Sequence, residues 1–331
     1  MAVHGRLAVV VAFVLTSIST VVVALRFYSR YFLVGKLGSP DWVMLAALLA
    51  TWSSAVINFY VVHFLNYSHV HDKDSFAEVV VGNLLFVWIY RINYIASLCL
   101  IKTSILLFYN YVASSHKSFH RIVRGMIAIV VVASFAMMIA GIFSCNPPSD
   151  AWSFDVFWNG FLGIHADQCY NPTLLWLFNA GFNLVTDTFI WILPIPFLLN
   201  LQSMPVRRRF ELIGIFSIGI MAIVASSIRL WVIVLWLSDW QKQGENTANL
   251  MIWSQVEQHA GIISASIPFL RPLLRKAFSA ARSERLSPSP AAKLIAPVPQ
   301  RTPIIPSPSP TFGSTNSPFR PPRSPLVPIS P

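Results

Sequence analysis

Long apolar segments alternate with short polar ones along most of this chain. A transmembrane helix needs about 20 mainly apolar residues to cross the hydrocarbon core of a bilayer, and seven segments of that kind are present. They predict helices, because open strands leave backbone polar groups unpaired in lipid and the short alternating segments of a membrane barrel are absent. The predicted spans are residues 7–27, 41–65, 83–111, 122–144, 172–199, 210–238 and 250–274.

The pattern changes after Arg285, where proline and serine replace the apolar runs. Fourteen of the 23 prolines lie between that residue and Pro331, and a segment of this composition cannot bury a core. We therefore expect an all-α membrane protein in which residues 1–275 form a seven-helix transmembrane domain. Residues 276–331 are expected to form a basic, disordered tail.

Composition agrees with a membrane protein. The chain is 55% hydrophobic and 11% charged, with a mean hydropathy of +0.61, whereas about 25% of the residues of a soluble domain are charged. The net charge of +11 is explained by topology and by anionic cytosolic lipid. Nucleic-acid binding is not expected, because no folded surface outside the spans is available for it.

The distribution of charge predicts the orientation. If the amino terminus faces outward, the segments that face the cytosol hold 18 of the 24 Lys and Arg residues and three of the 13 acids. The outer segments then hold eight acids and three basic residues. This positive-inside bias recurs at every loop. It predicts an outer amino terminus and a cytosolic tail. We expect a multi-pass membrane protein, with the plasma membrane as its location.

Two features of the predicted outer loops agree with this orientation. Cys145 and Cys169 lie in the loop between the fourth and fifth spans, and a disulfide is the favoured interpretation on an oxidising face. Two free thiols are the alternative. Asn66, in the sequence Asn66-Tyr67-Ser68 of the first outer loop, is a candidate glycosylation site.

The fourth loop also carries Trp152 with other aromatic and acidic residues. Such a mixture suits the cap of a pocket, and an interfacial aromatic belt is the favoured alternative. His165 with its neighbouring acids matches no spacing of metal ligands, so no metal is expected.

Ionisable residues inside the predicted spans suggest two interior clusters. Counting 1.5 Å per residue from the outer ends places Arg91, Arg229 and Glu257 at one depth, and Lys102 within side-chain reach of Asp187 below them. Isolated charges are costly in lipid, so pairing is expected. These clusters either gate a conformational change or simply hold the bundle together.

Known catalytic patterns are absent from the sequence. It contains no Gly-rich phosphate loop, no His-Glu-x-x-His and no nucleophile elbow, so we expect no enzyme and no cofactor. The last span contains no lysine for a retinal Schiff base.

An ordered set of motifs resembles the fungal rhodopsin-domain integral membrane proteins, the group that includes appressorium-type receptor-like proteins. The matching residues, spread over 7–275, include Arg26, Arg30, Asp41, Lys102, Cys145, Trp152, Cys169, Asn183, Asp187, Pro194, Pro196, Arg229, Trp253, Glu257 and Pro268. The resemblance implies a seven-helix, receptor-like protein without implying bound retinal. Asn110-Tyr111 stands where the family usually has a basic residue, which disfavours coupling to a G protein.

The tail contains candidate partner sites. Eight Ser-Pro or Thr-Pro pairs suit proline-directed phosphorylation, and Pro318, Pro321 and Arg323 fit a polyproline motif for an aromatic groove. An inert spacer is the alternative.

Taken together, the sequence favours a receptor-like protein that senses an extracellular small molecule or surface cue and signals through its basic cytosolic loops and tail. The alternatives are a transporter or channel that uses the intramembrane charges, and a membrane scaffold that acts through its tail.

Overall fold

The computed structural model describes residues 2–64, 73–112, 117–161, 169–170, 172–195, 206–238 and 243–286. These residues are almost entirely helical, and within them no strand forms beyond an isolated bridge between Cys145 and Cys169. The all-helical prediction is therefore confirmed.

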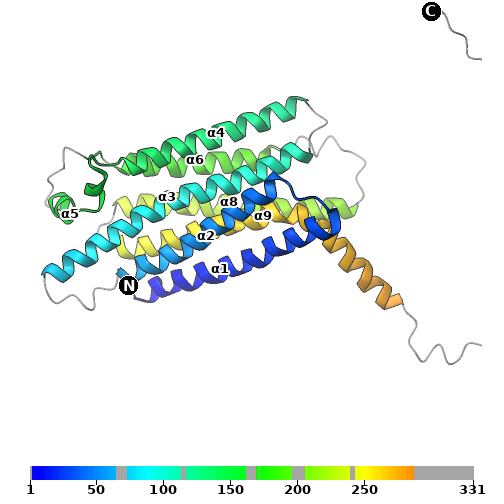
Figure 1. Ribbon diagram of the computed structural model, residues 1–331, viewed down its shortest axis with the longest axis horizontal. Helices are drawn as coiled ribbons and strands as arrows, with labels where there is room; N and C mark the ends of the chain where they lie inside the picture. The colour runs from blue at the N-terminus through cyan, green and yellow to red at the C-terminus, as the bar shows by residue number, and fades with distance from the viewer. Residues whose placement is uncertain are drawn as a thin grey trace, which may run out of the picture. The chain divides into compact units, whose positions relative to one another are not determined.

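Seven helices of 21 residues or more occur among the described residues, and they run back and forth alongside one another (Figure 1). Two short helices follow the fourth of them, η3 (Pro148–Trp152) and α5 (Phe154–Phe161). The long helices are α1 (Ala2–Tyr28), α2 (Ser39–Phe64), α3 (Lys73–Val112), α4 (Lys117–Ile142), α6 (Pro172–Ile192), α8 (Val206–Ser238) and α9 (Gln243–Leu286).

The two ends of the bundle differ, and we name them by what they contain. The disulfide end carries Cys145, Cys169, η3 and α5 (Figure 1). The η1 end carries η1, a π-helical turn over Ser29–Val34 that extends α1 and stops at Gly35. Gly35 has a φ of 72°, a left-handed conformation that glycine adopts without steric cost and that commonly ends a helix.

The helices expose many large apolar side chains and bury a number of polar ones beside the hydrophobic core. On α1 the buried face contains the small residues Ala8, Ala12, Thr16 and Ser19, whereas large residues such as Val10 are exposed. Small residues let membrane helices approach closely. Exposed apolar side chains are stable where the surrounding solvent is lipid.

Five helical segments are long and apolar enough to cross a membrane: Gly5–Val34, Ser39–Phe64, Ser75–Tyr111, Lys117–Ile142 and Gly219–Ser238. The protein is thus a membrane protein with several candidate spans. The two other long helices, α6 and α9, supply Asn183, Asp187, Glu257 and His259 to the interior. Their polar side chains lower the hydropathy of segments that the sequence also predicts to be spans.

Several helix boundaries differ from the sequence-based prediction by a few residues, and the start of α3 and the end of α9 differ most. α3 begins at Lys73 rather than near residue 83, and its 40 residues extend about 60 Å, twice the thickness of the hydrocarbon core. α9 continues to Leu286, so residues 276–286, which the sequence assigned to the disordered tail, are helical. Alanines and basic residues favour helix there, and no proline follows Pro272 until Pro288. The rest of the predicted tail lies outside the described residues.

Candidate functional site

A buried polar cluster lies between α3, α6, α8 and α9, and we call it the core cluster. Its charged members are four of the five residues that the sequence placed at two neighbouring depths, namely Lys102, Asp187, Arg229 and Glu257. The core cluster consists of Tyr94, Lys102, Asn183, Thr186, Asp187, Ser226, Arg229 and Glu257.

Lys102 forms the lower part of the core cluster. Its Nζ lies 3.1 Å from Asp187 Oδ1, as the sequence predicted. It also donates to Thr186 Oγ1 at 2.7 Å and to both the backbone and the side-chain oxygens of Asn183. Asn183 and Asp187 are one turn apart on α6, so a single helix face supplies all of these acceptors.

Glu257 forms the upper part of the core cluster. Tyr94 Oη donates to its Oε2 at 2.6 Å, Ser226 Oγ donates to its Oε1 at 2.6 Å, and the Asn183 amide also donates to Oε1. Arg229 Nη1 lies 3.5 Å from Oε2, and its guanidinium covers the Tyr94 ring at 4.2 Å from the centroid. Three helices thus converge on one carboxylate.

Ser226 joins the two parts. Its Oγ lies 2.8 Å from Asp187 Oδ2 as well as 2.6 Å from Glu257 Oε1. A serine hydroxyl has one proton to donate, so it can serve only one of the two carboxylates at a time. The hydroxyl therefore links the two ion pairs through a donor that has two alternative acceptors.

Arg91 does not join the upper part, although the sequence grouped it there. Its guanidinium lies 3.3 Å from the centroid of the Trp176 ring, and it makes no ion pair with any residue that the structure describes. The rise per residue specifies a position along the axis of α3, but it does not specify which side of α3 a residue occupies. Tyr94 contacts Glu257 in its place.

A second ionic cluster, the α1–α2 cluster, contains Arg26, Arg30 and Asp41. Asp41 is fully buried; its Oδ1 lies 3.0 Å from Arg26 Nε and its Oδ2 lies 3.1 Å from Arg30 Nε. The backbone N–H of Gly38 donates to Oδ2 at 3.0 Å. The sequence analysis counted these residues as loop charges and missed their pairing. The signal is an Arg-x-x-x-Arg face followed closely by an acid in the first turn of α2.

The α1–α2 cluster also holds α9. Arg26 donates to the Ala265 carbonyl at 3.1 Å and covers the Phe269 ring, while Ser29 donates to the Phe269 carbonyl at 2.8 Å. Pro268 and Pro272 have no backbone N–H, so each of them leaves one carbonyl of α9 without its helical hydrogen bond. Ala265 and Phe269 come directly after these two carbonyls. Side chains of α1 and η1 therefore donate to backbone oxygens of α9 near the two prolines that weaken the helix.

A histidine that the sequence analysis did not single out connects α9 to α1. His259 is 1% exposed; its Nε2 lies 3.1 Å from Thr16 Oγ1 and its Nδ1 lies 2.8 Å from Ser19 Oγ. The spacing of Thr16, Ser19 and the small residues of α1 is the signal for this contact. Neutral hydrogen bonds of this kind hold membrane helices together.

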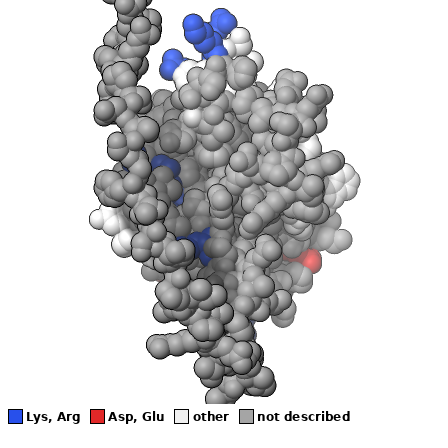
Figure 2. All heavy atoms as spheres, turned by 90° about the vertical axis from the view of Figure 1, so that its right-hand side faces the viewer, with Lys and Arg blue, Asp and Glu red and all other residues white. Residues whose placement is uncertain are grey.

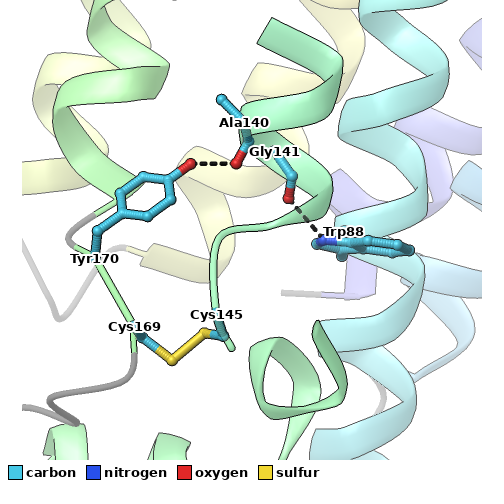
Figure 3. The surroundings of a disulfide bond; sticks show 6 residues. All are labelled: Trp88, Ala140, Gly141, Cys145, Cys169 and Tyr170. Carbon is cyan, nitrogen blue, oxygen red and sulfur yellow. Dashed lines mark hydrogen bonds between the residues drawn. A yellow bond between two sulfur atoms is a disulfide. The ribbon is translucent and has the colours of Figure 1, made fainter. Parts of the chain in front are cut away.

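At the disulfide end, Cys145 and Cys169 are bonded, with their Cα atoms 4.1 Å apart (Figure 3). The Tyr170 hydroxyl donates to the Ala140 carbonyl, and partial burial raises the pKa of Tyr170. Trp88 Nε1 donates to the Gly141 carbonyl at 3.0 Å, and the Trp88 ring packs against Trp152. Trp152 thereby attaches the described part of the loop to α3, and Tyr170 attaches it to α4.

Other predicted residues have less defined surroundings. Trp253 is half-buried on α9, Pro268 lies inside α9, and Pro194 lies in the turn after α6. The remaining ones, namely Asn66, His165, Pro196, Pro318, Pro321 and Arg323, lie outside the described residues.

The region beside the core cluster contains a small cavity between α3, α4 and α6. It is lined by Tyr94, Lys102, Met137 and Asn183 among others, and its volume of about 10 Å³ suits a single water molecule. No group of three metal-ligating side chains occurs in the described parts of the chain. The site therefore combines fixed charges with little open space.

Comparison with known proteins supplies the context for this geometry. The chain is 29% identical over 267 residues to "Receptor GIN3" of Arthrobotrys oligospora, with 78% of this chain and 60% of the relative covered. It is 25% identical to "Polyenoic acids biosynthesis gene cluster protein Ba17b" of Metarhizium anisopliae, with 82% and 74% covered. A "SAT4 family membrane protein" of Emericella nidulans is 28% identical over 58% of this chain and 46% of its own.

The chain thus spans from about half to three quarters of the length of these relatives. No solved structure matches it. The model of the fungal rhodopsin domain matches residues 25–276, a range that includes the α1–α2 cluster and the whole core cluster. The resemblance seen in the sequence motifs is confirmed, and this chain belongs to the fungal rhodopsin domain family.

Proposed function

We propose that this membrane protein is a receptor that crosses the plasma membrane seven times and senses a small molecule or surface cue at the disulfide end. The observation that carries the proposal is the core cluster, which joins α3, α6, α8 and α9 through two carboxylates and one shared serine hydroxyl. A ligand that moves one of these helices changes the pairing of the others.

Charge and the disulfide support the proposed orientation. Exposed basic residues occur at the η1 end, among them Lys36, Lys117, Arg121 and Arg124, and basic side chains are visible there in Figure 2. Basic segments remain cytosolic and disulfides form on the oxidising face. The η1 end is therefore the cytosolic end in this proposal, and α6 and α9 complete seven crossings.

Ser226 supplies the element that switches. Donation to Glu257 leaves Asp187 with Lys102 as its main partner, whereas donation to Asp187 leaves Glu257 with Tyr94, Asn183 and Arg229. The two arrangements differ in which carboxylate accepts the hydrogen bond, and because such a bond is worth about 1.5–3 kcal/mol, their difference in free energy does not exceed that range. A ligand with a differential affinity of that size is sufficient to shift the population between them.

Signal output is proposed at the η1 end. The α1–α2 cluster binds the proline-containing part of α9, so a shift of α9 reaches the cytosolic ends of α1 and α2. The basic inner loops would then contact an effector, and the polyproline motif of the tail would add a second docking site. We propose no catalytic activity and no cofactor.

The relatives support the receptor form of the proposal, because one of them bears the name of a receptor. A transporter that uses the same charges is the second candidate. The water-sized cavity beside Lys102 gives a solute no path through the described part of the bundle, so we place the transporter second.

A ligand-library screen tests the proposal. Binding to the native state raises the apparent stability of the purified chain, by about 2.7 kcal/mol at a ligand concentration 100 times Kd. We expect at least one small molecule to stabilise the protein without being transported into reconstituted vesicles. Solute uptake by the vesicles in the absence of a cytosolic partner would contradict the receptor assignment.

A further inference from the structure

The cavity beside the core cluster has the size of a binding site for one very small molecule. Its volume of about 10 Å³ is close to the smallest that holds a water molecule. Three helices contribute polar side chains to its lining, namely Tyr94 and Lys102 on α3, Ser134 on α4, and Asn179 and Asn183 on α6. The rest of the lining, which includes Met137 and Phe182, is mainly apolar and confines the molecule that the cavity binds.

The bonding of Lys102 determines which charge the bound molecule can carry. Its Nζ already bonds to Asn183, Thr186 and Asp187, and an ammonium group has only three protons to donate. An anion in the cavity would therefore gain no N–H group from Lys102. A cation would lie beside the ammonium charge and be repelled by it. A neutral molecule meets neither obstacle.

Ser134 faces the core cluster across this cavity. It is the only polar residue among the buried residues of α4, a helix that the structure describes in full. Some serines in the bundle, such as Ser227, donate to a carbonyl of their own helix, whereas Ser134 makes no such bond within α4. A buried hydroxyl in the hydrocarbon region is costly without a hydrogen-bond partner. The cavity is therefore the place where Ser134 can find one.

We propose that the cavity binds one ordered water molecule, which joins Ser134 of α4 to the amides of α6 that line the same space. Water both donates and accepts hydrogen bonds, so it can serve a hydroxyl and an amide at once. The direct hydrogen bonds of the core cluster come from α3, α6, α8 and α9, and the water extends this network to α4. The inference goes beyond the proposed function, because it applies to a transporter or a scaffold as well.

The link has a consequence for the disulfide end. Ala140 and Gly141 lie about two turns beyond Ser134 on α4, and their carbonyls accept hydrogen bonds from Tyr170 and Trp88 (Figure 3). A movement of the disulfide end therefore displaces α4. The water couples that displacement to α6 and to the core cluster.

Radiolytic footprinting tests whether the cavity is hydrated. Ionising radiation converts bound water into hydroxyl radicals that oxidise the nearest side chains, and mass spectrometry measures the oxidation. Met137 lines the cavity, whereas Met44 is buried in an apolar core. In the full-length wild-type protein in nanodiscs, we expect Met137 to be oxidised several times faster than Met44. Equal rates for the two methionines would show that the cavity is dry and would overturn the proposal.

Two valine variants of α4 locate the signal. Ser134→Val fills the cavity with apolar atoms and should lower the oxidation of Met137 to the rate of Met44. Ala136→Val adds side-chain volume at an exposed position of the same helix and should leave the oxidation of Met137 unchanged. Persistence of fast Met137 oxidation in Ser134→Val would mean that the radicals come from elsewhere, and the site would be refuted. The wild-type comparison with Met44 does not depend on the folding of either variant.

Ser134→Ala tests the bridge, because it removes the hydroxyl and keeps the space. Hydrogen exchange of the α6 backbone around Asn179 should increase, although the substitution lies on α4. Unchanged exchange in α6 would contradict the bridging role. Replacement of chloride by gluconate separates water from a small anion. An unfolding temperature that falls without chloride in the wild type, but not in Ser134→Val, would assign the cavity to an anion instead and overturn the proposal.

Discussion

The α1–α2 cluster and the core cluster are both buried and ionic, yet they are built differently. The first places two arginines on one fully buried aspartate, with partners 15 and 11 residues apart in sequence. The second pairs two basic residues with two acids across four helices, and Tyr94 and Glu257 are 163 residues apart. The ion pairs of the first cluster connect residues on either side of one turn, although Arg26 also bonds to α9, whereas the ion pairs of the second join helices that are far apart in sequence.

The difference concerns how many arrangements each cluster permits. Both oxygens of Asp41 are bonded to fixed donors, and Arg26 also pairs with α9. In the core cluster, Ser226 lies between two acceptors and Asp187 keeps 15% of its side chain exposed. We infer that the α1–α2 cluster holds the fold and that the core cluster is free to rearrange.

The largest expected effect comes from Asp41→Asn. Loss of this carboxylate charge leaves Arg26 and Arg30 buried without a counter-ion, and breaking a buried pair in this way costs about 3–5 kcal/mol. Thermal unfolding in detergent and the yield of folded protein measure the loss. Asp155→Asn, an exposed acid on α5, is the matched control and should change stability by less than about 0.5 kcal/mol.

A smaller loss is expected for Asp187→Asn, because Lys102 keeps Asn183 and Thr186 as acceptors and the site is partly exposed. We expect about 2–3 kcal/mol. Exchange of the two residues, as Lys102→Asp with Asp187→Lys, should recover part of the surface expression that each single variant loses. If the double variant lost as much surface expression as each single variant, the ion pair between Lys102 and Asp187 would not contribute to folding.

Ser226→Ala separates the role of the bridging hydroxyl from that of the charges. Loss of a hydrogen bond to a carboxylate is expected to lower the free energy of unfolding by about 1.5–3 kcal/mol. We expect a value near the lower end, because the hydroxyl donates to only one of the two carboxylates at a time. The neighbouring Ser227 is exposed and donates only to its own helix at Ile223, so Ser227→Ala should be neutral. Equal unfolding temperatures for both alanine variants would mean that the bridge contributes nothing.

The smallest effect is expected for Ser29→Ala in the α1–α2 cluster. This variant loses one neutral hydrogen bond to the Phe269 carbonyl, worth about 0.5–1.5 kcal/mol. Arg26 continues to hold α9 through Ala265. Hydrogen exchange of the α9 backbone after Pro268 should increase locally, while protection of α2 and α3 should not change. A global loss of protection would show that the contact is part of the folding core.

The sequence predicted those features of the structure that depend only on position along the chain or along a helix axis. Hydropathy gave the helices, and the rise per residue gave the depth at which Lys102 meets Asp187. It could not give rotation about a helix axis, so Arg91 was grouped with Glu257 although it lies over Trp176. The sequence analysis did not predict that Asn183 and Ser226 connect the two ion pairs, because it considered only charged residues and both of these side chains are neutral.

For the α1–α2 cluster, the sequence contained the information that predicts the ion pairs, but the residues were assigned to loops. Its residues were seen as a motif and as cytosolic charges, but their neighbouring positions in sequence already allowed them to meet around the turn at Gly35. The length of α9 was missed because its last turns carry charged residues that read as tail. In both cases the sequence held the signal, and the assumption that charged residues lie in loops concealed it.

The central claim is that the disulfide end and the η1 end face opposite sides of a membrane. Epitope tags at Met1 and Pro331, probed with antibody on intact and on permeabilised cells, test it most directly. We predict that the amino-terminal tag is accessible on intact cells and that the carboxy-terminal tag becomes accessible only after permeabilisation. Accessibility of both tags from the same side would contradict the seven-crossing arrangement and the receptor proposal that depends on it.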